Sequence, residues 1–170
     1  MMDRIDERIL RQGMARRGLA TEEGGRALRA TLAVIGERLV DDEAHALASW
    51  LPSELATIVE DAEYDADFGT QELFVRVARR MKAPTGRALE DAEIVLATLG
   101  EVLGVERATR LARAMPETAA GLILGHREAD LHAEVPPRSA ARHAPRATTL
   151  ASGRPGSLHP LYEGKPPAKS

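Results

Sequence analysis

Residues 31–52, TLAVIGERLVDDEAHALASWLP, decide the fold because the chain repeats their pattern at residues 95–116, VLATLGEVLGVERATRLARAMP. When the chain is aligned with itself at an offset of 64, ten of the 32 positions from 21 to 52 are identical, against roughly three expected from composition. We interpret this match as an internal duplication. The identical positions in the first copy are Thr21, Leu32, Ala33, Gly36, Glu37, Leu39, Ala44, Leu47, Ala48 and Pro52.

Both copies have the period of an amphipathic helix, with an apolar residue every three or four positions. An amphipathic helix precedes each central helix and two shorter helices follow it, so the pattern predicts four helical segments per copy. Alternating strand patterns are missing, and only 3% of the residues are aromatic. We therefore expect an all-α fold, a helical bundle of two tandem pseudo-symmetric repeats. The central apolar positions are Leu28, Leu32, Ile35 and Leu39, and then Leu89, Ala92, Leu96, Leu99 and Leu103.

Five single residues have predicted structural roles. Thr21 and Asp41 are placed as helix caps, because their side-chain oxygens could accept from free backbone amides at a helix start. Gly36 and Gly100 interrupt good helices, which indicates that another helix approaches closely there. For Trp50, the only tryptophan, we favour packing in the core over a role as an interface anchor.

The chain changes character near residue 134. The overall net charge is -3, but residues 135–170 carry six basic residues against one glutamate and hold seven of the ten prolines. We therefore predict a helical domain over residues 1–134, with repeat one at about 3–62 and repeat two at about 67–125. A flexible, disordered basic tail is expected over residues 135–170. Its charged residues are Arg138, Arg142, Arg146, Arg154, Lys165, Lys169 and Glu163.

Composition excludes several classes of function. Without cysteine there is no disulfide framework, thiolate metal site or cysteine nucleophile. No apolar stretch approaches the roughly 20 residues of a membrane span, so we expect a soluble, cytoplasmic protein with no membrane partner. Neither a phosphate-binding loop nor a dinucleotide fingerprint occurs, and no catalytic constellation is found. We therefore expect no cofactor and no enzymatic activity.

Part of the chain resembles a bacterial family catalogued as domain of unknown function 2267. The parts that carry the resemblance are residues 31–59, with GERL at 36–39 and LPSEL at 51–55, and then Phe68 and residues 73–77. The resemblance covers roughly residues 3–125 and implies a two-repeat helical domain. The second copy departs from it, reading GEVL at 100–103 and MPET at 115–118. The family implies no reaction, cofactor or catalytic residue.

The connection between the two copies is the most chemical-looking stretch. Asp61, Glu63, Asp65 and Glu72 take positions 1, 3, 5 and 12 of a possible calcium loop between helices. Alanine at position 6, where the loop needs glycine for its sharp turn, counts against calcium. The favoured reading is a solvated acidic linker that caps the next helix.

Two arginine pairs lie late in equivalent helices. Arg16 and Arg17 correspond to Arg79 and Arg80 at an offset of 63. Cations at these positions complement the carbonyl end of the helix dipole, which is the favoured interpretation. Alternatively, the pseudo-symmetry brings both pairs together as a patch that binds an anionic ligand or a partner.

The leading functional hypothesis is a non-catalytic protein-interaction or structural adaptor module, whose partner is another protein or a second copy of itself. Its tail holds a candidate docking motif; an inert extension is the alternative there. A second hypothesis is weak, salt-dependent binding of nucleic acid or an anionic surface through the basic tail. A ligand-binding or enzymatic domain with a site between the repeats ranks last. The docking motif comprises Leu150, Arg154, Leu158, His159, Leu161 and Tyr162.

Overall fold

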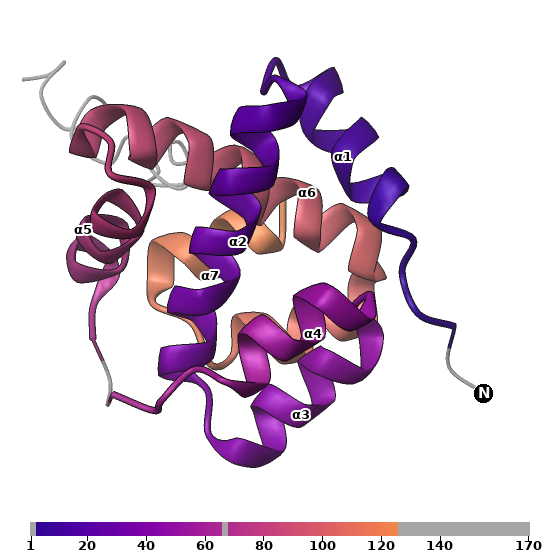
Figure 1. The fold of residues 1–170 in the computed structure, drawn as a ribbon. Coiled ribbons are helices and arrows are strands. Elements are labelled where there is room, and N and C mark those ends of the chain that lie inside the picture. Colours follow the sequence, from indigo (N-terminus) through magenta and orange to yellow (C-terminus); the bar gives the residue numbers. More distant parts are fainter. Residues whose placement is uncertain (1–2, 66–67, 126–170) are drawn as a thin grey trace, which may run out of the picture. The chain divides into compact units, whose positions relative to one another are not determined.

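A computed structural model describes residues 3–65 and 68–125, and within these ranges the chain forms seven helices and no strand (Figure 1). The predicted all-α fold is therefore confirmed. None of the described helices combines the length and the apolar character needed to cross a membrane. The helices are α1 (Glu7–Arg16), α2 (Thr21–Arg38), α3 (Asp41–Trp50), α4 (Ser53–Glu60), α5 (Thr70–Met81), α6 (Thr85–Ala112) and α7 (Glu117–Ile123).

Helices α2 and α6 form the centre of the helical body (Figure 1). Helix α2 packs against α1, α4, α5 and α6, while α6 also contacts α1, α3, α5 and α7. The predicted stripes of both helices are buried except at Leu89, which is half-buried. Trp50 is 4% exposed, so its predicted place in the core is confirmed.

Helix α6 is long because it joins two helical segments across a kink at Gly104 (φ 78°, ψ 165°). In the first half of the chain the position 64 residues earlier is Val40 (φ -72°, ψ 161°), which separates α2 from α3. The four helical segments predicted for the second copy are therefore present, as α5, the two parts of α6 on either side of Gly104, and α7. Both halves break the helix at the same place.

Gly104 adopts a backbone conformation that only glycine tolerates well, although an added Cβ would meet no atom within 4 Å. We expect Gly104→Ala to lower the free energy of unfolding by about 1–3 kcal/mol through backbone strain alone. Gly86→Ala is the matched control, because Gly86 lies in the same helix with a negative φ and equally open space. Chemical denaturation would measure both, and equal stabilities of the two variants would contradict this expectation.

Gly36 and Gly100 lie where a short helix approaches a central helix. A Cβ on Gly36 would lie 2.8 Å from the carbonyl oxygen of Val59, and a Cβ on Gly100 would lie 1.8 Å from that of Ile123. The predicted close approach is confirmed at both glycines. Val59 and Ile123 are themselves 64 residues apart, so the tertiary contact repeats at the same offset as the sequence.

The predicted caps at Thr21 and Asp41 are wrong. Each is the first residue of its helix, and the preceding N-cap residues, Ala20 and Val40, have no side chain that could accept a hydrogen bond. The Val40 amide instead donates to the Glu43 carboxylate at 3.4 Å. Acidic residues still occupy the first turn of both helices, where they complement the positive end of the helix dipole.

Candidate functional site

Two clefts on the described residues are relevant to function. The larger of these two lies between α2, α4, α5 and the connection that follows α4. It is open to solvent and has a volume of about 950 Å³. All four residues of the candidate calcium loop line it. The lining residues are Ala33, Glu37, Ile58, Asp61, Ala62, Glu63, Tyr64, Asp65, Glu72, Arg76, Arg79 and Arg80.

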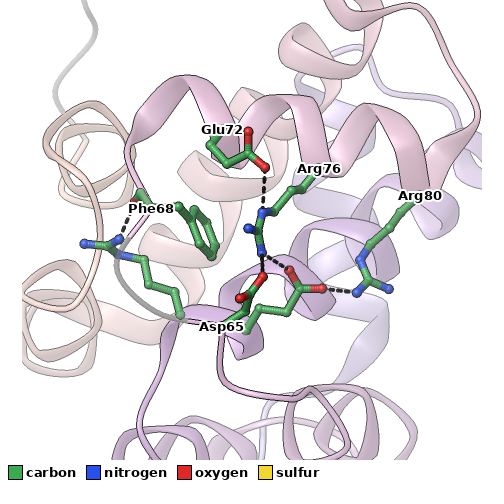
Figure 2. Close-up of polar contacts among 7 residues, drawn as sticks. Asp65, Phe68, Glu72, Arg76 and Arg80 are labelled. Atoms are coloured by element: carbon green, nitrogen blue, oxygen red, sulfur yellow. Dashed lines mark hydrogen bonds and ion pairs between the residues drawn. The ribbon is translucent and has the colours of Figure 1, made fainter.

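Arg76 is the centre of the charge network in this cleft. Its Nη1 donates to Glu37 Oε2 at 2.9 Å and to Asp65 Oδ2 at 2.7 Å, and its Nε donates to Glu72 Oε1 at 2.9 Å. Arg80 binds the other oxygen of Glu37. Figure 2 shows the Arg76 guanidinium held between Glu72 and Asp65. These carboxylates, Glu37 first, raise the pKa of Arg76.

Phe68 anchors the end of the connection between the two halves. The guanidinium carbon of Arg76 lies 4.2 Å from the centroid of its ring, and that of Arg38 lies 5.6 Å away. Arg38 also donates to the Phe68 carbonyl and, at 2.7 Å, to the Ala114 carbonyl. Arg38 therefore links the end of α2 to the start of the second half.

Two carboxylates of the candidate calcium loop face an arginine in the structure. Asp65 and Glu72 both accept hydrogen bonds from Arg76, so a cation already occupies the place between them. No group of three or more acidic or histidine side chains that could hold a metal ion occurs among residues 3–65 and 68–125. Asp61 ends α4 and lines the cleft together with Glu63. The acidic linker supplies the Asp65 carboxylate to an arginine network. The prediction that the linker caps the next helix is wrong, because the N-cap residue of α5 is Gly69 and no side chain of the described residues caps this helix.

A smaller cleft of about 480 Å³ lies between α6 and α7. Its wall is mostly apolar, and two of its aliphatic side chains face solvent: Val105 is 85% exposed and Leu124 is 44% exposed. The lining residues are Arg17, Ala97, Gly100, Glu101, Gly104, Val105, Ala108, Leu122, Ile123, Leu124 and Gly125.

The structure assigns the two arginine pairs to different glutamates. Arg17 Nη2 lies 2.6 Å from Glu101 Oε2, and Arg16 lies 4.0 Å from the same carboxylate. Arg80 instead binds Glu37 in the larger cleft, where Arg79 also lies. The contacts therefore do not assemble one four-arginine patch. Arg17, and more weakly Arg16, lower the pKa of Glu101, which keeps this carboxylate ionised.

The two clefts are related by the internal offset of the chain. In each, the glutamate next to the close-packed glycine binds an arginine from the first helix of the other half. This reciprocal pairing of glutamates and arginines could not be predicted from the sequence, because the partners lie far apart along the chain. Among the ion pairs described in the larger cleft, that of Glu72 and Arg76 has the i,i+4 spacing that a helical pattern reveals. The equivalent lining positions of the two clefts are Ala33 and Ala97, Glu37 and Glu101, and Ile58 and Leu122 at an offset of 64, with Arg17 and Arg80 at an offset of 63.

The candidate docking motif at residues 150–162 lies outside the described residues.

The described residues thus define an all-helical domain with two related clefts. A family model described as "Uncharacterized conserved protein (DUF2267)" matches residues 6–122, and the chain belongs to this family. The family predicted from the sequence resemblance is confirmed. Neither the curated proteins nor the solved structures contain a match to the chain.

Proposed function

We propose that this protein is a non-catalytic interaction module and that the cleft between α6 and α7 is its binding surface. The observation that supports this proposal is the exposure of Val105 and Leu124 at an apolar hollow. When a partner covers aliphatic side chains at a concave surface and removes them from water, their burial stabilises the complex. Val40, which is 47% exposed, does not line this cleft.

The larger cleft has a structural role in this proposal. Its most central arginine, Arg76, is surrounded by three carboxylates, and Glu37 is shared between Arg76 and Arg80. Charged groups that satisfy one another in this way hold the connection against α2 and α5. We therefore assign the recognition of partners to the smaller cleft.

The finer features predicted from the sequence belong to the same proposal. We infer a duplicated two-repeat domain, because the glycine contacts and the glutamate–arginine pairs recur at offsets of 64 and 63. We also keep a bacterial origin and a cytoplasmic location as parts of the proposal. The candidate docking motif at residues 150–162 would add a second contact for the partner.

A second candidate function is weak association of the basic tail with nucleic acid or another anionic surface. The excess of six basic residues over one acidic residue in residues 135–170 favours it. Such binding depends on the release of counterions and would fall steeply as salt rises. A partner held through the apolar cleft would be retained at moderate salt.

The proposal predicts that Val105→Asp removes partner binding while the fold is kept. Aspartate should be tolerated there, because the equivalent position of the first half is Asp41, also the first residue of a helical segment. Val40→Asp is the matched control, since Val40 is 47% exposed and does not line the cleft. In affinity capture from cells of origin, we expect V105D to recover at least about tenfold less partner than the wild type and V40D.

The capture would be run at low and moderate salt, with partners identified by mass spectrometry. Equal recovery by V105D and the wild type would reject the cleft as the binding surface. Recovery of nucleic acid alone, released by moderate salt from all three proteins, would favour the tail hypothesis instead. Circular dichroism of each variant would establish that the helical content is unchanged.

A further inference from the structure

We infer that the cleft between α6 and α7 recognises an extended, acidic peptide segment of a partner protein. This inference rests on the proposed function, because it names the occupant of the same cleft. It is drawn from the equivalent surface of the first half, around Gly36 and Glu37, on which a segment of the chain itself is packed.

The segment that follows α4 serves as the template for the occupant. The Asp65 amide donates to the main-chain carbonyl of Glu37 at 2.8 Å. The Ala62 Cβ lies against Gly36, only 2.6 Å from the place where a side chain would begin. The Asp65 carboxylate then accepts from Arg76 at 2.7 Å. A short acidic stretch with a small apolar residue therefore fits a wall made of a glycine, a glutamate and arginines.

Charge explains why the segment that follows α4 is acidic. Apart from the segment itself, the wall carries the three arginines of α5 against Glu37 and Glu72. The segment adds Asp61, Glu63 and Asp65 to the lining, so a negative segment faces a positive surface. Charge-assisted hydrogen bonds of this kind supply both attraction and register.

The second cleft has the same sign of charge. Among the described residues that line it, Glu101 is the one carboxylate, and it pairs with Arg17 of the lining and with the neighbouring Arg16, so a positive charge is left over. The side chain of Arg16 is 68% exposed and sits 4.0 Å from Glu101, which leaves most of its donors facing solvent. An acidic partner can use these donors without breaking the closer pair of Arg17 and Glu101.

The second cleft differs from the first in its apolar floor. Val105 lines the second cleft, whereas its counterpart Asp41 does not line the first, and Leu122 and Leu124 continue the apolar wall. An occupant therefore needs at least one apolar side chain next to its carboxylates. Such a segment combines burial of Val105 with pairing to the arginines at the edge.

The test uses a synthetic peptide with the sequence of residues 61–68, DAEYDADF, blocked at both ends, and ¹⁵N-labelled full-length protein. We expect amide shift changes at Gly104, Val105 and Leu124 with a dissociation constant of about 1 mM, as befits a short flexible peptide. The control peptide NAQYNANF, in which amides replace the carboxylates, should bind at least about fivefold more weakly.

Protein variants locate the charge recognition. Arg16→Gln should weaken the acidic peptide by about threefold or more and leave the amide peptide unchanged. Arg11→Gln is the matched control, because Arg11 lies on the same helix but pairs with Glu7. V105D should remove the shifts caused by either peptide.

Each other outcome overturns the inference. Equal affinity of the two peptides, or shifts confined to another surface, would reject acidic recognition at this cleft. Shifts of cleft amides that depend on protein concentration without peptide would assign the cleft to a second copy of the chain. If the peptide fails while V105D still loses its partner in capture, the inference falls and the proposed function stands; if V105D also keeps its partner, both fall.

Discussion

Replacing Gly100 with alanine should lower the free energy of unfolding by about 3 kcal/mol or more, the largest stability effect we expect from one methyl group in this protein. The added Cβ would lie 1.8 Å from the Ile123 carbonyl oxygen and 2.6 Å from its carbonyl carbon. Both atoms belong to the backbone of α7, so no side-chain rotation can relieve the clash. Thermal and urea unfolding followed by circular dichroism would measure the change.

Gly25→Ala is the control for this substitution. Gly25 lies inside α2 with no atom within 4 Å of an added Cβ, so alanine should stabilise the helix by about 0.5–1 kcal/mol. Gly36→Ala should fall between the two, because the backbone atom nearest to its added Cβ, the Val59 carbonyl oxygen, lies at 2.8 Å instead of 1.8 Å. A G100A protein as stable as the wild type would refute the close approach of α7 to α6.

Arg76→Met is expected to destabilise the protein by about 2 kcal/mol, the second largest effect. The side chain of Arg76 is 20% exposed, and its removal leaves Glu37, which is 12% exposed, with Arg80 as its only cation among the described residues. Asp65 and Glu72 would lose their shared donor, and Phe68 would lose the guanidinium over its ring. Methionine keeps most of the aliphatic contact, so the change isolates the charge.

The control for Arg76 is Arg29→Met in α2. Arg29 is 51% exposed and pairs with Glu54 at 3.5 Å, so its loss should cost less than about 0.5 kcal/mol. A double-mutant cycle with Glu37→Gln should give a coupling energy of about 1–2 kcal/mol between Arg76 and Glu37. Independent effects of the two substitutions would mean that this ion pair contributes nothing to the fold.

Local patterns in the sequence were sufficient to predict the helices. The spacing of Leu28, Leu32 and Ile35 produces one buried stripe whatever packs against it, because helical periodicity is a property of the chain itself. The breaks at Pro52 and Pro116 follow from the lack of an amide donor in proline. The prediction was wrong at Thr21 and Asp41, where one residue of shift turns an N-cap into the first helical residue.

The candidate site was predictable only in part. The acidic connection was recognised from its carboxylates, but the sequence could not tell whether they face a metal ion or an arginine. Arg76 meets Asp65 and Glu37 across 11 and 39 residues of chain, and no local spacing encodes such distances. The exposure of Val105 is hidden for the same reason, since valine in a helical pattern reads as core.

The one-dimensional pattern of the chain was enough to establish an all-helical domain, its family and the two glycines at which helices meet. These features depend on residue type, period and a repeated offset, all of which are local or can be read by comparing the chain with itself. The pairing of Glu37 with Arg80 and of Glu101 with Arg17 arises only in the tertiary structure. Each half supplies the arginine for the glutamate of the other half, and only folding brings the two halves together.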